Sequence, residues 1–190
     1  MKVLLMSDRL SAPYSLAILT ISDSGAKGER LDTSGDAISR IMLEEDFNEC
    51  IRDIIPDDLG MIAKKLISWS DQEQIDLILT TGGTGLSPRD VTPEATRSVI
   101  DFEVPGLSES LRILTVKKTP MSVLSRSVAG VRSGCLIINL PGSPKGVCEY
   151  LEILVPVIPT RSLRFLICSG DSSPETYSTL PNFSAKFSSI

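Results

Sequence analysis

The sequence predicts an α/β fold in which helices cover both faces of a mainly parallel sheet. Short apolar runs alternate along the chain with segments whose apolar residues recur at the spacing of one helical face. The runs are continuously apolar, which is typical of strands that are buried on both faces. Strands and helices that follow one another in this way favour parallel pairing, because each helix returns the chain to the start of the next strand.

The first strand is expected over Ser15–Ile21, and it runs into the polar turn cluster 22–25. After this cluster, Thr33 or Ser34 is expected to cap a helix that ends near Asp46, because apolar residues recur at helical spacing between them. This unit places a polar loop directly after a buried strand.

The second strand is expected over Cys50–Ile55, where Pro56 and Asp57 end it. A helix follows over Leu59–Trp69, with one apolar face and with Asp58 as its expected N-cap. A second acidic loop therefore follows a second strand.

The third strand, Ile75–Leu79, leads into a glycine-rich loop. Thr92 is expected to cap the next helix, with Pro93 at its first position. Pro105-Gly106 breaks that helix, and another is expected over Leu107–Val116.

The fourth strand is expected over Cys135–Leu140. It runs into the turn Pro141–Lys145, and a helix follows over Gly146–Val155. All four expected strands thus end in loops that carry glycine or polar residues.

The length of 190 residues suits one well-packed domain. We place it at residues 15–168, between a loose leader (1–14) and a Ser-rich tail (169–190). The formal net charge of −5 disfavours nucleic acid and anionic membranes as main partners. The apolar run at the N-terminus is too short for a signal peptide, so a cytoplasmic location is expected.

The chain contains no histidine, which excludes the usual general base and the commonest zinc ligand. Acid–base or metal chemistry must then use carboxylates, hydroxyls or amines, and hard oxygen ligands favour Mg²⁺ over zinc. None of the four cysteines forms a CxxC pair, so a zinc ribbon or thioredoxin-type motif is not expected.

The loop Thr80–Gly85 (TTGGTG) is expected to bind phosphate through backbone N–H groups. Its glycines permit a tight turn, and its threonine hydroxyls add donors. The sequence is neither a Walker A loop nor GxGxxG, and a purely structural strand-to-helix turn is the alternative. The candidate phosphate contacts are Gly82, Gly83, Thr84 and Gly85.

Asp57 and Asp90 are the candidate catalytic carboxylates. Beside an anion-binding loop, either can hold Mg²⁺, and the metal would in turn hold a triphosphate that an acidic protein otherwise repels. The alternative for each is a turn-forming or helix-capping role.

Further candidate contacts come from the other loops. Arg126 can fork onto a phosphate and Lys145 can neutralise one, although both are also consistent with solvated surface side chains. The carboxyl ends of parallel strands meet at one edge of a sheet, so these loops are expected to form one site. The remaining candidates for substrate or phosphate binding are Ser22, Asp23, Ser125, Pro141, Gly142 and Ser143.

Six segments, in order, resemble the molybdenum-cofactor biosynthesis proteins of the MogA/MoaB type. That family includes the molybdopterin adenylyltransferases and the G domains of gephyrin and its plant counterpart. The resemblance covers residues 15–167, and the run TTGGTG…PRDVTPEAT is its most specific part. The segments are 19–23 (LTISD), 55–58 (IPDD), 79–96 (LTTGGTGLSPRDVTPEAT), 105–106 (PG), 124–126 (LSR) and 138–144 (INLPGSP).

The resemblance implies a three-layer α/β/α sandwich, a molybdopterin-binding-like fold, in a protein that is typically a homotrimer. It implies binding of MgATP and molybdopterin, transfer of AMP to the terminal phosphate of molybdopterin, and release of pyrophosphate. The adenylylated pterin would then pass to a molybdenum insertase. In this role Asp57 and Asp90 would hold Mg²⁺ or act in catalysis, and the loop 82–85 would cradle phosphate. Ser22, Asp23 and 141–145 would line the nucleotide or pterin pocket.

Two other functions share this fold. One is a non-catalytic molybdopterin carrier or scaffold, against which the presence of both Asp57 and Asp90 argues. The other is the nucleotide pyrophosphatase domain of competence-damage-inducible proteins, which usually lies in a longer chain. The sequence leaves open whether molybdenum or tungsten is the downstream metal.

Overall fold

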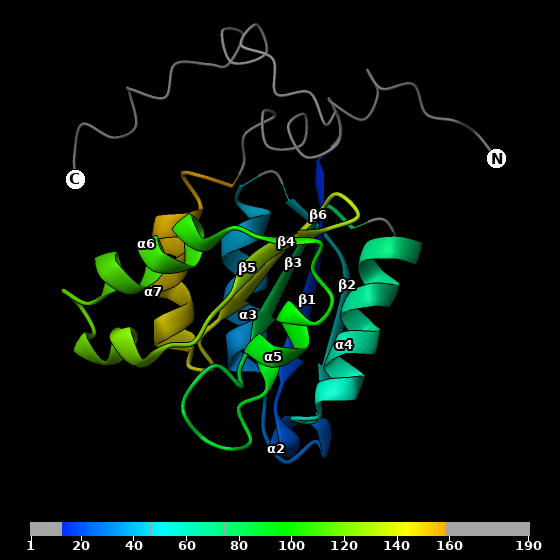
Figure 1. Cartoon of the computed structure of the whole chain (residues 1–190), viewed down its shortest axis with the longest axis horizontal. Coiled ribbons are helices and arrows are strands. Elements are labelled where there is room, and N and C mark those ends of the chain that lie inside the picture. Colours follow the sequence, from blue (N-terminus) through cyan, green and yellow to red (C-terminus); the bar gives the residue numbers. More distant parts are fainter. Residues whose placement is uncertain (1–12, 46, 74, 159–190) are drawn as a thin grey trace, which may run out of the picture.

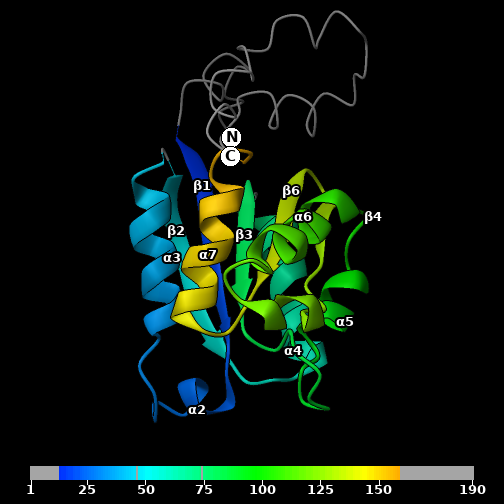
Figure 2. The ribbon, with the colours of Figure 1, turned by 90° about the vertical axis from the view of Figure 1, so that its left-hand side faces the viewer.

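A computed structural model of the chain describes residues 13–158, apart from positions 46 and 74. The expected tail, 169–190, and nearly all of the expected leader lie outside the described residues. The described part forms a six-stranded sheet with helices packed on both faces (Figures 1 and 2).

The sheet has the strand order β2-β1-β3-β6-β5-β4. The pairs β1–β2, β1–β3 and β3–β6 are parallel, and β5 and β4 extend the sheet in antiparallel pairs. The prediction of a mainly parallel sheet is therefore confirmed. The strands are β1 (Tyr14–Ile21), β2 (Phe47–Ile55), β3 (Leu77–Thr81), β4 (Phe102–Glu103), β5 (Ala129–Arg132) and β6 (Cys135–Leu140).

The helices form two layers, with α3, α6 and α7 on one face of the sheet and α4 and α5 on the other (Figure 1). A π-helix, η1, extends α4, and a short 3₁₀ helix, η2, follows α6. The bounds are α2 (Asp23–Ala26), α3 (Thr33–Leu43), α4 (Leu59–Ile67), η1 (Ser68–Gln72), α5 (Thr92–Arg97), α6 (Pro105–Thr115), η2 (Pro120–Leu124) and α7 (Pro144–Leu154).

The central strands are buried on both faces, as their continuous apolar sequences predict. In β1, Leu16 and Ile18 face the core under α3 and α7, whereas Ala17 and Leu19 face the core under α4 and α5. All four side chains are fully buried. The chain thus forms the expected three-layer α/β/α sandwich.

Two strands were not expected from the sequence. β4 has only two residues, and β5 has four with Gly130 among them, so neither presents a continuous apolar run. The expected strands also shift, since β2 begins at Phe47 rather than Cys50. β3 spans Leu77–Thr81 rather than Ile75–Leu79.

The helix caps correct two expectations and confirm one. Asp58 accepts a hydrogen bond from the N–H of Met61 and caps α4, as expected. Asp32, rather than Thr33 or Ser34, caps α3. Thr92 is the first residue of α5 rather than its cap, because its hydroxyl donates to the carbonyl of Gly82 (2.9 Å) instead of accepting from the helix.

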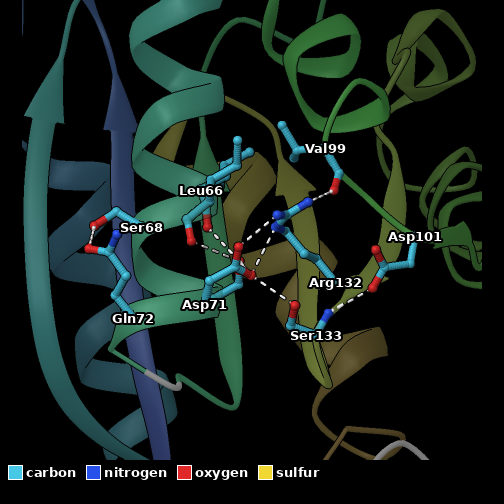
Figure 3. Close-up of polar contacts among 10 residues, drawn as sticks. Leu66, Ser68, Asp71, Gln72, Val99, Asp101, Arg132 and Ser133 are labelled. Atoms are coloured by element: carbon cyan, nitrogen blue, oxygen red, sulfur yellow. Dashed lines mark hydrogen bonds and ion pairs between the residues drawn. The ribbon is translucent and has the colours of Figure 1, made fainter.

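A polar network closes the edge of the sheet opposite the carboxyl ends of the parallel strands (Figure 3). Arg132, at the end of β5, donates to both carboxylate oxygens of Asp71 (3.0 and 2.6 Å) and to the carbonyl of Val99 (2.6 Å). Ser133 donates its hydroxyl to Asp71 and its N–H to Asp101, both at 2.8 Å. These bonds tie η1 and the α5–β4 connection to the β5–β6 hairpin.

No helix among residues 13–158, positions 46 and 74 aside, is both long enough and apolar enough to cross a lipid bilayer.

Asn139 of β6 forms a buried polar network inside the sheet. Its side-chain amide donates to the hydroxyls of Thr80 (3.0 Å) and Thr96 (2.9 Å), and its oxygen accepts from the N–H of Val128 (3.2 Å). Asn139 is fully buried, so water cannot replace these partners. The network joins β6 to β3, which precedes the glycine loop, and to α5, which follows it.

We expect Asn139→Ala to lower the free energy of unfolding by about 2–4 kcal/mol, because two hydroxyls and one N–H lose their buried partner. Urea unfolding of the wild type and the variant measures the difference. Asn48→Ala, on the exposed part of β2, is the matched control and should change stability little. Equal stability of the two variants would contradict a stabilising role for the network.

Candidate functional site

The loops that follow β1, β2, β3 and β6 meet at the carboxyl edge of the sheet, as the sequence predicts. They enclose a cleft of about 250 Å³ at the end of the molecule where α2 lies in Figure 1. The N-terminus of the eleven-residue helix α3 forms another wall. The lining residues are Thr20, Ile21, Ser22, Gly25, Arg30, Leu31, Asp32, Thr33, Ser34, Ile54, Asp57, Thr81, Gly82, Gly83 and Gly142.

Two glycines let the chain turn sharply after β3. Gly82 and Gly83 have φ angles of 102° and 62°, a region that favours glycine. A Cβ atom on Gly82 would lie 2.2 Å from the carbonyl oxygen of Ile21, and one on Gly83 would lie 2.4 Å from Thr92 Oγ1. Glycine is required at both positions because the backbone of β1 and the start of α5 approach so closely.

Hydrogen bonds fix this turn against the loop after β6. The hydroxyl of Thr81 donates to the carbonyl of Pro141 (2.7 Å), and the N–H of Gly82 donates to the carbonyl of Leu140 (3.3 Å). From α3, the hydroxyl of Ser34 donates to the carbonyl of Gly142 (3.0 Å). The two loops are therefore held together as one rigid floor of the cleft.

Asp57 and Asp23 hold each other by reciprocal hydrogen bonds. The N–H of Asp23 donates to Asp57 Oδ2, and the N–H of Asp57 donates to Asp23 Oδ1, both at 3.2 Å. The other oxygen of Asp57 lies over Gly83, 3.2 Å from the position of a Cβ on that glycine. The Asp57 carboxylate is thus fixed above the glycine turn.

The two carboxyl groups are electrostatically different. Partial burial raises the pKa of Asp57 above its usual value, and the negative charges of Asp23 and Asp90 act in the same direction. The partly exposed Asp23 is instead hydrogen-bonded and ion-paired to Arg89, which lowers its pKa. Asp57 therefore carries an incompletely compensated negative charge at the edge of the cleft.

Asp90 lies on the far side of the same loop. Its Oδ2 accepts a hydrogen bond from the N–H of Ser87 (2.8 Å) and lies 3.0 Å from the position of a Cβ on Gly85. Asp90 is half-buried and forms no salt bridge with any residue that the structure describes. The Asp90 carboxylate thus lies next to the glycine loop without a salt bridge from a described cation.

Arg126 braces the loop from behind. Its guanidinium donates to the carbonyls of Gly85 (2.7 Å) and Asp90 (2.5 Å) and is ion-paired with Glu94, and its N–H donates to the carbonyl of Thr84 (2.9 Å). All three guanidinium nitrogens of Arg126 therefore already donate to oxygen atoms of the protein. The structure therefore gives Arg126 a positioning contact with the loop rather than an open donor fork.

A second pocket, of about 380 Å³, lies on the other side of the glycine loop. It is lined by the loop itself, by α6 and η2, and by the N-terminal part of the eleven-residue helix α7. The lining residues are Thr84, Gly85, Leu86, Thr115, Thr119, Met121, Ser122, Leu124, Ser125, Pro141, Ser143, Gly146, Glu149 and Tyr150.

The residues expected at the site divide between these two pockets. The first is lined by Ser22, Asp57, Gly82, Gly83 and Gly142, and the second by Thr84, Gly85, Ser125, Pro141 and Ser143. Asp23, Asp90 and Arg126 adjoin the glycine loop without lining either pocket. Lys145 is 78% exposed, and its nearest acidic partner is Glu149 at 3.8 Å.

Sequence reasoning missed two groups of lining residues. Arg30, Leu31 and Asp32 enter the first cleft from the loop before α3, and no local motif marks them. Thr115 and Tyr150 in the second pocket come from helical positions that a periodicity argument assigns to the core. The position of Arg30, Leu31 and Asp32 could have been predicted from the topology. In a parallel strand–helix–strand unit the helix begins at the carboxyl edge of the sheet, so the residues just before α3 lie there.

No group of three or more Cys, Asp and Glu residues that could hold a metal ion occurs in the described part of the chain. Mg²⁺ does not require one, because it is commonly held by one or two carboxylates together with water and substrate phosphates. Asp57 and Asp90 fit that requirement, since both carboxylates adjoin the loop and neither is neutralised by a salt bridge to a described residue.

Comparison with known proteins gives one family and several close relatives. The family described as "Probable molybdopterin binding domain" matches residues 17–160. A molybdopterin adenylyltransferase of Helicobacter pylori J99 is 44% identical over 146 residues, covering 76% of this chain and 83% of the relative. The Escherichia coli K12 protein of the same name is 39% identical over 140 residues, covering 72% and 71%.

Solved structures agree with these relatives. MoaB from Thermus thermophilus superposes with a TM-score of 0.76 at 51% identity, covering 83% of this chain and 98% of that one. The Mog protein from Mycobacterium ulcerans gives a TM-score of 0.75 at 38% identity, covering 81% and 99%. CinA from Thermoplasma acidophilum has a TM-score of 0.57 at 20% identity, covering 75% and 96%, and shares the fold alone.

The opposite pKa shifts of Asp57 and Asp23 predict opposite effects of pH on stability. The folded-state pKa of Asp57 is raised, so its ionised form costs folding free energy at neutral pH, and this cost vanishes below the unfolded pKa. Asp57→Asn should therefore raise the melting temperature at neutral pH, and the gain should shrink as the pH falls.

Asp23→Asn is the matched control for this prediction. The folded-state pKa of Asp23 is lowered, so its charge stabilises the fold above the unfolded pKa, and the stabilisation is lost as the pH falls through the folded pKa. The variant should be less stable than the wild type at neutral pH. Thermal unfolding of both variants across the acidic range measures the difference, and shifts of the same sign would contradict the assignment.

Proposed function

This chain belongs to the molybdopterin-binding domain family of the MogA/MoaB type, and from that premise we propose that it is a molybdopterin adenylyltransferase. The proposed reaction transfers AMP from ATP to the terminal phosphate of molybdopterin and releases pyrophosphate. The observation that supports it most directly is the pair of pockets that share the glycine loop, because the reaction must bring two anionic substrates together.

We assign the first cleft to ATP and the second pocket to molybdopterin. The first cleft joins the glycine turn, the N-terminus of α3 and the carboxylate of Asp57, a combination suited to phosphates and a divalent metal. The second pocket includes apolar side chains such as Leu86, Met121 and Leu124, which suit a flat heterocycle. Its wall also includes Ser143, which caps the N-terminus of α7.

The chemistry needs no histidine. An oxygen of the molybdopterin phosphate attacks the α-phosphorus of ATP, a new P–O bond forms, and the bond to the pyrophosphate oxygen breaks. The attacking phosphate is already ionised at neutral pH, so no strong general base is required. Catalysis then consists of aligning the two phosphates and neutralising their charge.

Mg²⁺ would be held by Asp57 and Asp90 together with the triphosphate, and it would supply positive charge to the transferring group. Around it, Gly82, Gly83, Thr84 and Gly85 would cradle phosphate through their N–H groups. Arg126 acts on this loop by holding the carbonyls of Gly85 and Asp90 in place. Ser125, Ser143 and Lys145 would contact the molybdopterin phosphate, and Pro141 would shape the wall of the same pocket. Ser22, Asp23 and Gly142 would shape the ATP side.

A non-catalytic molybdopterin carrier is the second candidate function, and it shares the second pocket with the enzyme. The incompletely compensated carboxylate of Asp57 favours the enzyme over the carrier. Binding a pterin phosphate does not require a second negative charge beside the phosphate loop, whereas holding a metal ion does.

We propose that the adenylylated product passes to a molybdenum insertase. A cytoplasmic location remains a prediction of the sequence.

We expect Asp90→Asn to lower kcat by at least about 10²-fold and to leave the fold intact, because the amide removes the charge that would bind Mg²⁺. Pyrophosphate release from MgATP and molybdopterin measures the rate, and circular dichroism checks the fold. The matched control is Asp53→Asn, which removes a carboxylate of β2 that is paired with Lys65 of α4. This variant should be fully active. Normal turnover by Asp90→Asn would exclude this role for Asp90.

We propose a homotrimer as the assembly, and large apolar side chains that are exposed on β4, α6 and η2 support contacts between copies. They are Phe102 of β4, Ile113 and Leu114 of α6, and Val123 of η2, with 40% to 66% of each residue exposed. Sedimentation equilibrium should give three times the chain mass. Ile113→Asp should shift the protein toward the monomer, and a monomeric wild type would exclude the trimer.

A further inference from the structure

The second pocket contains buried polar groups that the proposed phosphate chemistry does not use. Glu149 and Tyr150 of α7 and Thr115 of α6 line it, and they are 7%, 1% and 2% exposed. Buried polar side chains in native proteins are nearly always hydrogen-bonded. These three therefore need partners, and their surroundings show which ones are present.

Glu149 is a buried carboxylate with few donors. The hydroxyl of Thr119 is shared between its two oxygens, at 3.2 and 2.9 Å. The ammonium group of Lys145 lies 3.8 Å from Oε1 and is largely in solvent. An ionised carboxylate has about four acceptor positions, so most of its capacity has no donor among the described residues. A ligand that brings N–H donors would relieve the cost of burying this charge.

Two hydroxyls in the same wall also lack partners. Thr115 Oγ1 and the phenol oxygen of Tyr150 are buried and form no hydrogen bond with any described residue. Both side chains line the second pocket, but the two oxygens are themselves enclosed, so a molecule bound there would reach them through a shift of the pocket wall. The unpaired hydroxyls and the under-satisfied carboxylate thus indicate a ligand with several polar groups on one edge.

We propose that Glu149 binds the pyrimidinone edge of the pterin and that Tyr150 adds a hydrogen bond to the same ring system. This inference rests on the proposed function and names the side chains that make the pocket select a pterin. Apolar contacts from Leu86, Met121 and Leu124, each more than 40% exposed without a ligand, would cover the faces of the ring.

The hydrogen-bonding pattern of the ring explains the selectivity. A pterin presents a ring N–H and an amino group side by side, and a carboxylate accepts both hydrogen bonds at once. Adenine presents a donor next to an acceptor on its corresponding edge, so one carboxylate oxygen would face a lone pair. Glu149 therefore favours the pterin over the base of ATP in this pocket.

The bond from Thr119 to Glu149 also has a structural effect, because it ties the segment before η2 to α7. A purely structural Glu149 would affect folding and both substrates alike. A pterin-binding Glu149 would affect molybdopterin alone. The experiment must therefore measure the two substrates separately.

We expect Glu149→Gln to raise the KM for molybdopterin roughly 10- to 100-fold, because an amide offers one acceptor where the pterin needs two. The KM for ATP, and kcat at saturating molybdopterin, should stay close to the wild-type values, since the lost contact is present in ground and transition states alike. Anaerobic steady-state assays of pyrophosphate release give all three constants.

Glu152→Gln is the matched control, because it removes a carboxylate from the same helix where the side chain is 60% exposed and paired with Lys118. It should leave both KM values unchanged. An unchanged KM for molybdopterin in Glu149→Gln would overturn the proposal, and so would an equal rise in both KM values.

Tyr150→Phe tests the proposal even if Glu149→Gln does not fold. Removing a hydroxyl that has no partner should leave the melting temperature of the free protein unchanged or higher. The same change should weaken anaerobic binding of molybdopterin several-fold, as followed by pterin fluorescence. A lower melting temperature with unchanged affinity would show that the hydroxyl serves the fold.

Failure of the proposed function would look different. A wild-type protein that binds molybdopterin without releasing pyrophosphate from ATP would be a carrier, and the Glu149 and Tyr150 variants would still be tested by binding alone. A wild-type protein that is active, with Glu149→Gln and Tyr150→Phe binding molybdopterin normally, would overturn only the assignment of the pterin edge.

Discussion

The close approach of three chain segments at Gly82 constrains the whole carboxyl edge of the sheet. A Cβ atom there would collide with the carbonyl of Ile21, and a Cβ on Gly142 would lie 3.2 Å from Gly82 Cα. The ends of β1, β3 and β6 can therefore come together only if position 82 has no side chain. This contact also sets where Gly83 turns, and hence where Asp57 and Thr92 meet the loop. The pockets on either side of the loop depend on the same backbone contact.

At this edge of the sheet the carboxylate of Asp23 is neutralised by a salt bridge, whereas that of Asp57 has no salt bridge to a described residue. Arg89 pairs with Asp23, while Asp57, held to Asp23 only through backbone N–H groups, keeps a raised pKa. The same residues could have formed a symmetric cluster with Arg89 between them. Because they do not, the free energy cost of ionisation falls on Asp57, the carboxylate nearest Gly83. A divalent cation or a cationic ligand is what would reduce that cost.

The parts of this structure that the sequence predicts are those encoded locally. The continuous apolar runs of β1, β3 and β6 indicate buried parallel strands, and the motif around Gly82–Asp90 indicates the loop. β4 and β5 were missed because two and four residues are too short for a periodic signal. Glu149 and Tyr150 were missed because they lie at ordinary helical positions, and only the fold brings them beside Gly85 and Ser125. The roles of individual site residues stay predictions for the same reason, since contacts distant in sequence decide them.

An acidic protein that joins two anions must concentrate positive potential without carrying net positive charge. The net charge is −5, yet each pocket includes the N-terminus of an eleven-residue helix, α3 in the first and α7 in the second. Few N–H groups of the first turns are free, because Asp32 and Ser143 accept from Gly35 and Gly146 and because α7 begins at Pro144. Each helix terminus still contributes roughly half a positive charge, which the carboxylate of Asp32 partly offsets at α3. These partial charges are fixed by the fold and need no reorganisation when the phosphates meet, which is the condition under which electrostatic catalysis is most effective. The glycine loop between the two termini is then the place where the two phosphates can approach each other most closely.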